Sequence, residues 1–476
     1  MTAIQLEHFL SELRACVGAA HVLTQALDTW SYTEDWRKKY HGKALAVVSP
    51  GSTEEVAAVM KAACTYKVPV VTQGGNTGLS GGATPDDSGL QIVLSTRRLN
   101  RIRHIDTAND AVIVEAGVVL QVLQDAALEC DRLFPMTLAA QGSCTVGGNL
   151  ATNAGGTAVL RYGSMRDLTL GLEVVTPDGS IWSGLRALRK DNTGYDLKQL
   201  YIGSEGTLGV ITAAALKLFP RPKSMLTAMM ALESLQGAVN FLAAARGALG
   251  PSLTAFEAMS SPCVPLLARH FPDLRWPFSE LYPVAVLVEI SDYDSDTHAR
   301  EVLEGLVVDA MKSGTVVDGV VAESIAQSRA LWSLRESISE AQGMEGAHIK
   351  HDISLIASSL SAFVTEAERA LERVEPGARV AWFGHLGDGN LHFNVLAPKG
   401  ADAQAFVSRQ GEINMIVHDL VAAYNGSISA EHGIGQLRRD ENHRYKSPLE
   451  LTLMNSIKHA LDPLGRMNPG KVLVSI

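Results

Sequence analysis

The sequence has little of what marks membrane, secreted or nucleic-acid-binding proteins. No apolar run approaches the roughly 18 residues that cross a bilayer. The five cysteines are scattered and form no C-x-x-C pair, so they indicate free thiols in a reducing compartment and not a disulfide frame. The formal net charge of −10 argues against nucleic acid or an anionic membrane surface as the main partner. We therefore predict a cytoplasmic protein without a transmembrane segment.

Low-complexity segments and internal repeats are also absent, and what remains is an ordinary globular composition. The chain has 476 residues, of which 46% are hydrophobic and 19% charged, so two or three domains with sizeable cores are expected. The opening segment contains Glu7 and Glu12 and predicts an amphipathic helix, not a signal peptide. The segment Pro220-Arg221-Pro222 predicts a boundary, because two prolines break a regular element.

The first half alternates predicted strands and helices around a glycine-rich loop. Strands at 44–50 and 68–72, with a helix opening at Ser52 between them, predict a β-α-β unit. Further strands and a helix are predicted at Gln91–Ser95, Ala111–Glu115 and Leu120–Glu129. The loop 74–82 holds five glycines and could bring backbone N–H groups close to an anion such as a pyrophosphate. Alone, this pattern fits a surface glycine loop at least as well.

Two further regions are rich in small residues. Residues 141–156 contain five glycines, two asparagines and several hydroxyls, and residues 202–211 are similar. Apolar strands on both sides argue against disorder. Backbone wrapped closely around a flat, polar-edged ligand is the more physical interpretation.

Beyond Pro222 the pattern becomes that of an α+β sheet with helices on one side. Helices are predicted at Ser234–Leu249, His298–Ser313, Ala322–Gln342 and Ser358–Val374. Strands are predicted at Val284–Ile290, Ile349–Ile356, Val380–Phe383 and Leu391–Leu396.

A metal-like set of residues lies in this second half. His385 and His392 flank a Gly-Asp-Gly-Asn turn, and they approach each other if the flanking strands pair antiparallel. With Glu431 they would form the ligand set of an open catalytic zinc site. Spacing alone favours a surface or hydrogen-bonded histidine pair by roughly two to one, because no short zinc motif is matched. The adjacent His432 shifts this balance a little, since neighbouring side chains can divide ligation and acid–base work.

Two cations lie upstream of these histidines. Arg335 and Ser339 are spaced i, i+4 on one predicted helix, and Lys350 lies in a predicted strand. If they converge, they would hold a carboxylate. Taken singly, Arg335 and Lys350 are more typical of solvated charges.

Together these segments resemble a known family. The segments 74–82, 142–156 and 191–212 resemble the FAD-binding domain of the vanillyl-alcohol-oxidase flavoprotein superfamily. The segments 384–395, 429–435 and 462–473 resemble its FAD-linked oxidase C-terminal domain. The match runs from about residue 40 to the end, and it is most similar to FAD-linked D-2-hydroxy-acid dehydrogenases, which include enzymes for D-2-hydroxyglutarate and D-lactate.

The resemblance implies an α+β architecture with three parts. Residues 1–220, the N-terminal helix included, would form the two-part FAD-binding domain. Residues 221–425 would form a ferredoxin-like substrate domain, and residues 426–476 a helical C-terminal segment that packs back on the FAD domain.

The resemblance also implies a set of flavin-binding residues. They are Gly74, Gly75, Asn76, Thr77, Gly78, Leu79, Pro135, Gly142, Ser143, Thr145, Gly148, Asn149, Ala151, Thr152, Glu205, Gly206, Gly209, Ile211 and Asn468. Many superfamily members attach FAD through a histidine in the glycine loop. This chain has Asn76 at that place, so non-covalent FAD is expected.

The resemblance also implies roles for residues of the second half. His385, His392 and Glu431 match ligands of a divalent metal, for which the resemblance implies zinc, and His432 matches the base beside the substrate hydroxyl. Arg335, Ser339, Lys350, Asn394 and His432 match substrate contacts. Ser339 stands where relatives usually have threonine, so the hydroxyl is kept and the methyl is lost.

These roles predict oxidation of a D-2-hydroxy acid to a 2-oxo acid. Metal and base together would favour loss of the hydroxyl proton, and hydride would pass from C2 to flavin N5. A second cationic anchor indicates a distal carboxylate, as in D-2-hydroxyglutarate, since two buried cations without an anion would be costly. D-lactate dehydrogenase, a glycolate-oxidase-type subunit, an O₂-using oxidase and a non-catalytic metal-binding protein are the alternatives.

Besides the substrate, two kinds of partner are expected, an electron acceptor and a second copy of the chain. A separate electron acceptor, namely a quinone, an electron-transfer flavoprotein or a cytochrome, would dock on a surface that no motif marks. Relatives of the family suggest a homodimer. Zinc, manganese and iron are not distinguished by a ligand set of two nitrogens and one oxygen.

Overall fold

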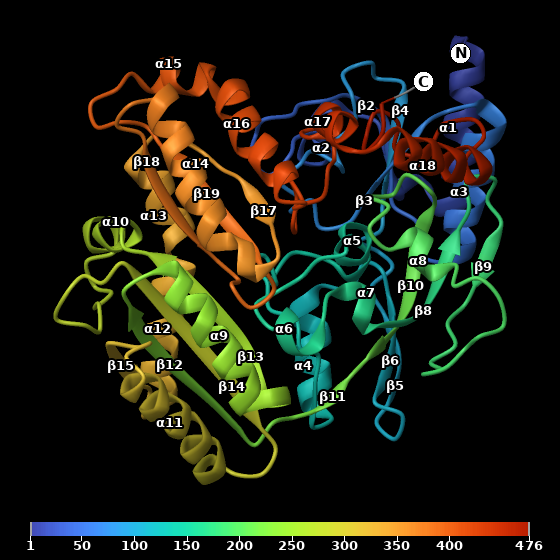
Figure 1. The fold of residues 1–476 in the computed structure, drawn as a ribbon. Helices are drawn as coiled ribbons and strands as arrows, with labels where there is room; N and C mark the ends of the chain where they lie inside the picture. Colours follow the sequence, from blue (N-terminus) through green and yellow to red (C-terminus); the bar gives the residue numbers. More distant parts are fainter. Residues whose placement is uncertain (1, 475–476) are drawn as a thin grey trace. The chain divides into compact units, whose positions relative to one another are not determined.

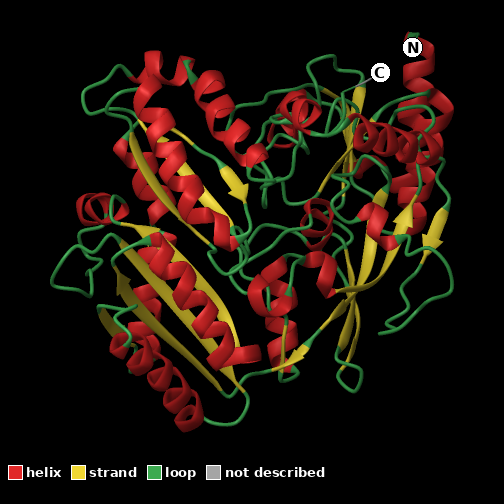
Figure 2. Cartoon of the chain, viewed as in Figure 1, coloured by secondary structure: helices red, strands yellow, loops and turns green. Residues whose placement is uncertain are grey.

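The computed structural model describes residues 2–474, and the chain divides into two compact units. The first unit contains the residues up to Gly156, residues 163–221 and the residues from Glu431 onward. The second unit contains residues 157–162 and 222–430. Figures 1 and 2 trace the helices and strands of each unit.

A four-stranded sheet carries the glycine-rich loop of the first unit. Its order is β1 (Val22–Leu23), β2 (Ala44–Val48), β4 (Gln91–Ser95) and β3 (Val70–Gln73). Both β2 and β3 run parallel to β4, which lies between them. The predicted β-α-β unit is therefore present, but a third strand separates its two strands.

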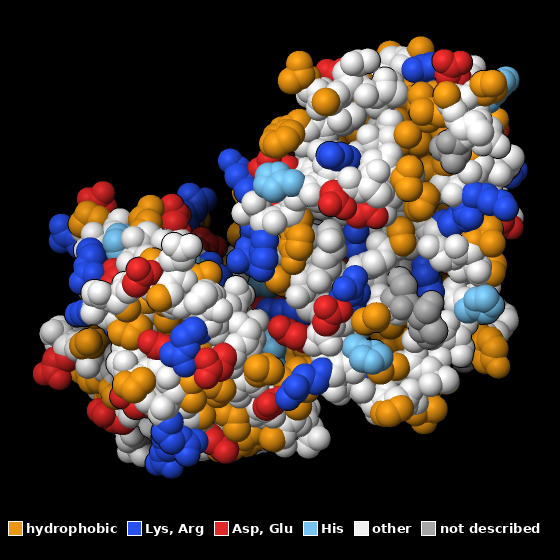
Figure 3. Space-filling view, turned by 90° about the horizontal axis from the view of Figure 1, so that it is seen from above, with side chains coloured by type: hydrophobic (Ala, Val, Ile, Leu, Met, Phe, Trp, Pro, Cys, Tyr) orange, Lys and Arg blue, Asp and Glu red, His pale blue; other side chains and the backbone are white. Residues whose placement is uncertain are grey.

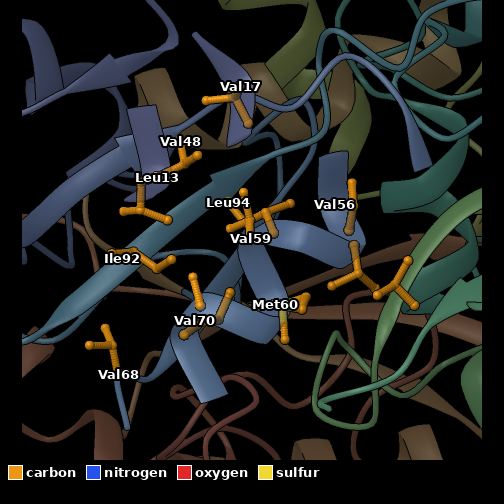
Figure 4. Packing of buried hydrophobic residues seen from close by; sticks show 14 of the residues in the cluster. Leu13, Val17, Val48, Val56, Val59, Met60, Val68, Val70, Ile92 and Leu94 are labelled. Carbon is orange, nitrogen blue, oxygen red and sulfur yellow. The ribbon is translucent and has the colours of Figure 1, made fainter. Parts of the chain in front are cut away.

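One helix and its cap explain how this sheet is covered. Ser52 caps α3 (Thr53–Tyr66) by accepting a hydrogen bond from the Glu55 N–H. Val56, Val59 and Met60 give α3 an apolar face at helical spacing. Figure 4 shows these side chains against Ile92 and Leu94 of β4 and Val70 of β3. The predicted N-terminal helix is also confirmed, as α1 (Ala3–Val17), and Leu13 and Val17 join the same core.

The remaining elements of the first unit surround a second, antiparallel sheet. Its order is β5 (Ile102–Asp106), β6 (Ala111–Glu115), β10 (Val210–Lys217), β8 (Thr169–Val175) and β9 (Ile181–Ser183). The short strands β7 (Arg132–Leu133) and β11 (Phe219–Pro220) pair with each other. The helices are α2 (Ala26–Thr33), α4 (Leu120–Glu129), α5 (Val146–Thr152), α7 (Met165–Leu168), α8 (Lys198–Tyr201), α17 (Arg439–Tyr445) and α18 (Pro448–Leu461).

The second unit is built on one eight-stranded sheet. The order is β15 (Asp318–Val321), β12 (Ser224–Leu232), β14 (Val284–Asp292), β13 (Leu253–Ser260), β18 (Arg379–Gly384), β19 (Asn390–Leu396) and β16 (His348–Ile349), and β17 (Asp352–Ser354) also pairs with β19. The helices are α6 (Val159–Tyr162), α9 (Leu235–Leu249), α10 (Cys263–His270), α11 (Asp296–Lys312), α12 (Ile325–Glu336), α13 (Ile338–Glu345), α14 (Leu360–Val374), α15 (Ala403–Ser408) and α16 (Gln410–Ala423). In chain order, β12, α9, β13, β14, α11 and β15 make the expected ferredoxin-like arrangement.

The expectation of helices on one side of this sheet is wrong. Phe256 and Met259 of β13 point to opposite faces, because side chains alternate along a strand. Phe256 meets Phe241 of α9, with ring centroids 5.6 Å apart. Met259 instead joins a core cluster with Leu334 of α12 and Ala341 of α13. Both faces of the sheet are therefore covered by helices.

Two predicted elements are each interrupted. The predicted helix 322–342 is two helices, α12 and α13, which meet at Ser337. The predicted strand 349–356 is split between β16 and β17, because the His351 N–H donates to the side-chain oxygen of Asn394, 3.2 Å away, and not to a strand carbonyl.

Charge on the surface is mixed. On the face that Figure 3 draws, Lys and Arg side chains are interspersed with Asp and Glu side chains. Among residues 2–474, no helix is both long enough and apolar enough to cross a membrane.

The sheet of the second unit contains a carboxyl group whose charge is disfavoured. Glu289 of β14 accepts hydrogen bonds from Trp332 Nε1 at 2.7 Å and from Thr227 Oγ1 at 3.4 Å. Burial raises the pKa of Glu289 to about 7, although these two hydrogen bonds act in the opposite direction. Because the folded pKa lies above the ordinary value, the folded state gains stability from the protonated form, and that gain is lost as the pH rises toward 7.

We predict that Glu289→Gln is more stable than the parent at pH 8, by on the order of 1–3 kcal/mol. The amide keeps an acceptor for Trp332 and carries no charge, so the two proteins should be equally stable near pH 4.5. Urea unfolding at both pH values measures the difference. An equal difference at pH 4.5 and pH 8 would contradict the titration of Glu289.

Candidate active site

Two of the glycine-rich segments pack against each other within the first unit. A Cβ placed at Gly74 would lie 2.3 Å from Thr145 Oγ1, and one at Gly75 would lie 2.2 Å from the Ser143 carbonyl oxygen. Thr145 is the N-cap of α5 and accepts a hydrogen bond from the Gly148 N–H. The absence of side chains at these two glycines therefore allows the loop after β3 to pack against the loop before α5.

Other glycines of the same segments face open space. Among the described residues, no heavy atom lies within 4 Å of a Cβ built at Gly78 or at Gly142. Two polar atoms of the first unit, both near Gly206, are buried without a partner in residues 2–474, namely Thr72 Oγ1 and Asn468 Oδ1. Buried polar atoms are rarely left unpaired, so these atoms and the open glycines fit a bound polar group such as a dinucleotide cofactor.

A second group of contacts joins three other predicted flavin segments. Asn468 is buried and donates from Nδ2 to the carbonyl oxygens of Gly82 and Glu205, each at 2.8 Å. The Glu205 N–H donates to the Ala151 carbonyl at 2.8 Å. A Cβ at Gly206 would lie 3.4 Å from the Thr72 side chain. The C-terminal segment is thus tied to the loops that follow β3 and α8.

The Glu205 side chain has a role that the sequence did not predict. Its carboxylate accepts hydrogen bonds from the N–H groups of Ile434 at 2.7 Å and Gly435 at 2.8 Å. Burial raises the pKa of Glu205 to about 6, while these two hydrogen bonds lower it. Glu205 therefore holds the loop that directly follows Glu431 and His432.

The other predicted flavin residues are distributed more widely. Asn76 has φ +58°, and its Nδ2 donates to the Glu34 carbonyl at 2.9 Å. Thr77 and Leu79 flank Gly78, and Asn149, Ala151 and Thr152 lie on α5. Gly209 and Ile211 lie at the start of β10 against β8, and Pro135 is buried after β7.

A cavity in the first unit adjoins this group of loops. Its volume is about 1290 Å³, and its lining includes Thr207, Asn468 and residues of α17 and α18. Lys471 also lines it and is 4% exposed, and burial lowers its pKa to about 8. The segment 206–209 and the C-terminal segment therefore share one cavity.

The structure brings the three predicted metal ligands together. His385 begins the turn after β18 and His392 lies on β19, and these strands pair antiparallel as predicted. The two imidazole centroids are 5.7 Å apart. The ligand atoms of His385, His392 and Glu431 all lie within 4.8 Å of one another. The donor set of two imidazoles and one carboxylate fits a divalent metal such as zinc.

Backbone contacts explain the approach of Glu431 to the two histidines. Ser427 bridges to Ser354 of β17, and the Ala430 N–H donates to the Asp352 carbonyl at 3.2 Å. Glu431 is the next residue. β17 itself pairs with β19, with Asp352 opposite His392.

A carboxylate that the sequence reasoning missed lies behind this group. Glu257 of β13 accepts from His385 Nδ1 at 2.6 Å and from Arg335 Nε at 2.8 Å. Burial raises the pKa of Glu257, but the attraction of His385 and Arg335 outweighs burial and lowers it to about 2. The signal that could have found it is a single charged residue within the apolar run 253–259.

The predicted carboxylate anchor is placed differently from the expectation. Arg335 is 7% exposed, but Glu257 already balances its charge, and its guanidinium lies over the Phe383 ring, 4.7 Å from the centroid. Lys350 is exposed and donates to Ser339 Oγ at 3.0 Å. The inference that two buried cations lack an anion was therefore wrong, because one is paired and the other is not buried.

The last two predicted residues differ in accessibility. Asn394 is buried, and its side chain is engaged by the His351 N–H and by Gln342 Oε1, the latter at 2.6 Å. The His432 side chain is 31% exposed, and its Nε2 lies 4.0 Å from Glu431 Oε2. The Ser80 hydroxyl donates to the His432 carbonyl at 3.0 Å, which fixes the backbone at this position.

Two families of known proteins match most of the chain. Residues 44–184 match the family described as FAD binding domain, and residues 221–472 match the family described as FAD linked oxidases, C-terminal domain.

Relatives of established name are similar over nearly the full chain. A D-2-hydroxyglutarate dehydrogenase from Xanthomonas citri pv. viticola is 38% identical over 460 residues, which cover 97% of this chain and 96% of that protein. The mitochondrial D-2-hydroxyglutarate dehydrogenase of Danio rerio is 40% identical, over 92% of this chain and 80% of that protein. The solved structure of 4-ethylphenol oxidase from Gulosibacter chungangensis superposes with a TM-score of 0.74 at 18% identity, covering 100% and 98% of the two chains, and shows the same fold.

We predict that Gly75→Ala destabilises the protein and that Gly78→Ala does not. The new methyl at position 75 must displace the backbone at Ser143, which costs about 2 kcal/mol, whereas the methyl at position 78 meets open space. Thermal unfolding followed by circular dichroism should show a midpoint lower by roughly 4–8 °C for Gly75→Ala alone. Equal midpoints for the two variants would show that the two loops do not pack as described.

Proposed function

We propose, from the premise that the chain belongs to the family of FAD-linked oxidases, that it is an FAD- and divalent-metal-dependent D-2-hydroxyglutarate dehydrogenase. The product would be 2-oxoglutarate. The observation that carries this proposal is the convergence of His385, His392 and Glu431 in a chain whose other half matches an FAD-binding domain.

The loops of the first unit would hold FAD. The open sides of Gly78 and Gly142 and the unpartnered Thr72 and Asn468 atoms support this placement. FAD supplies a hydride acceptor when bound. Asn76 directs its side chain to the Glu34 carbonyl and has no nucleophilic or ring nitrogen to offer, which supports non-covalent binding.

The three converging residues would hold the metal, and zinc fits their donor set. A divalent metal, when bound, polarises a coordinated hydroxyl and lowers its pKa. Glu257 and Asp352 stand behind the two histidines, since His385 Nδ1 bonds Glu257 and His392 Nδ1 lies 3.9 Å from Asp352. The hydrogen bond to Glu257 leaves Nε2 of His385 for the metal.

His432 is the proposed base. Its imidazole is partly exposed beside Glu431, and the hydrogen bonds of Ser80 and Glu205 hold the backbone at His432 and directly after it. It would accept the proton of the substrate hydroxyl. A positioned general base typically contributes roughly 10²–10⁴-fold to the rate.

Lys350, Ser339 and Arg335 are the proposed carboxylate anchor. The Lys350 ammonium and the Ser339 hydroxyl already contact each other, and a carboxylate could bind both. Asn394 is a proposed substrate contact, although its side chain has two partners within the protein.

D-lactate is the second candidate substrate. Because Glu257 neutralises Arg335, this arginine does not require an anion from the substrate. A monocarboxylate would then leave no buried cation unpaired.

The electron acceptor is proposed to be a separate molecule, namely a quinone, an electron-transfer flavoprotein or a cytochrome. The cysteine pattern predicts a reducing, cytoplasmic location.

Anaerobic mixing of the yellow holoenzyme with a panel of D-2-hydroxy acids tests the proposed reaction. D-2-hydroxyglutarate should bleach the flavin fastest, and removal of the metal with a chelator should slow bleaching by about 100-fold or more. Restoring zinc should restore the rate. Bleaching that a chelator leaves unchanged would remove the metal from the proposal, and no bleaching by any member of the panel would remove the activity.

Lys350→Met separates the two candidate substrates. The loss of a charge-assisted hydrogen bond to a distal carboxylate should raise KM for D-2-hydroxyglutarate by roughly 10–100-fold and leave KM for D-lactate within about twofold. Lys312→Met, on the exposed surface of α11, is the matched control and should change neither constant. Parallel losses on both substrates would contradict the assignment of Lys350.

A further inference from the structure

Glu257 is a carboxylate that is fully buried inside a β-sheet. It occupies the central region of the eight-stranded sheet, between β14 and β18, and its residue is 0% exposed. An ionised carboxylate without partners is costly in such surroundings by several kcal/mol. The hydrogen bonds from His385 and Arg335 are therefore what makes the burial of this charge possible.

Each oxygen of Glu257 is taken by a different partner. Oε1 accepts from His385 Nδ1 at 2.6 Å, and Oε2 accepts from Arg335 Nε at 2.8 Å. Both partners come from other elements, since His385 follows β18 and Arg335 lies on α12. One carboxylate thus holds one proposed metal ligand and one proposed substrate contact.

The contact with His385 sets which ring nitrogen is available. A carboxylate can only accept, so Nδ1 must carry the proton and the lone pair is left on Nε2. His392 Nδ1 lies 3.9 Å from Asp352 Oδ1, which is too far for a hydrogen bond, so the carboxylate contact is specific to His385. Partners of this kind fix the tautomer and the ring orientation of metal-binding histidines.

The contact with Arg335 fixes the guanidinium. Nε is engaged by Glu257, and the guanidinium carbon lies over the Phe383 ring. The plane of the guanidinium is therefore held from two sides while its terminal nitrogens remain donors.

We propose that Glu257 is a positioning residue that holds His385 with Nε2 available to the metal and holds Arg335 in the orientation that binds substrate. This role rests on the proposed function, because it concerns the same site. A merely structural counter-ion would stabilise the sheet and would leave metal affinity unchanged once the fold is preserved.

Two double variants test the contact with His385. Glu257→Leu/Arg335→Met and Glu257→Gln/Arg335→Met both remove the buried charge pair, and replacement of such pairs by residues of similar volume is often neutral for folding. They differ in one respect, since glutamine keeps an oxygen that can accept from His385 Nδ1 and leucine does not.

The measurement is zinc affinity by chelator competition on the FAD-loaded, full-length protein. The leucine double variant should bind zinc about 10–100-fold more weakly than the parent, and the glutamine double variant should recover most of that loss. Glu289→Gln on the neighbouring strand is the control, and it should bind zinc as the parent does.

The tautomer gives a second readout that does not depend on activity. In the metal-free parent, ¹⁵N-edited NMR of labelled histidine should show His385 protonated at Nδ1. The leucine double variant should show a mixture of tautomers at His385, and the glutamine double variant should resemble the parent.

The single variant Glu257→Gln tests the contact with Arg335. The glutamine amide has one oxygen and no charge, so it cannot accept from both His385 and Arg335, and the guanidinium loses its ionic partner. KM for D-2-hydroxyglutarate should rise about 10-fold or more. The control Glu289→Gln should leave this KM within about twofold of the parent.

The outcomes separate this role from the proposed function. Equal zinc affinities for the leucine and glutamine double variants, in a parent that binds zinc, would overturn the role of Glu257 and leave the metal site standing. A parent that binds no divalent metal would remove the proposed function and this role together. Loss of zinc binding in Glu289→Gln would also overturn the role, because buried charge in the sheet would then act without a specific contact.

Discussion

The second unit depends on the burial of one carboxylate, Glu257, between the Arg335 guanidinium and the His385 imidazole. Glu257 sits in the middle of a sheet covered on both faces, and His385 and Arg335 supply the hydrogen bonds that make its charge tolerable. Because the partners come from the β18 turn and from α12, the same requirement fixes both elements to β13. The proposed metal ligand and the proposed substrate contact are thus positioned by a constraint of folding.

The first unit meets a different constraint, which is close packing of irregular backbone. Gly74 and Gly75 have no room for a side chain against Ser143 and Thr145, and Asn468 ties the C-terminal segment to the loops at Gly82 and Glu205. Loops held this tightly keep their shape without a regular hydrogen-bond ladder. The same unit also has open glycine faces and buried polar atoms without a partner, as expected of a preformed site for a polar cofactor.

Both units use carboxylates to hold the residues proposed to act on substrate. Glu205 binds the backbone just after His432, Glu257 binds the His385 ring, and Asp352 faces the His392 ring. A metal-assisted reaction requires that the residues binding metal and substrate are held precisely, and surrounding hydrogen bonds can do this. Glu257 and Glu289 lie in the same sheet and have pKa values shifted in opposite directions, because only Glu257 is paired with Arg335 and His385.

The sequence by itself predicted α1, α3 and α4, the strands β2, β3, β4 and β6, and the family, and it predicted that His385 approaches His392 if their strands pair antiparallel, as they do. These follow from local periodicity, capping and motifs that lie within a few residues of each other. Only the tertiary structure decided which helices cover both faces of the second sheet, where α12 ends, and that Arg335 is already neutralised. The physical reason is distance along the chain, since Glu257 meets Arg335 across 78 residues and His385 across 128, and no local pattern records which buried charges become neighbours.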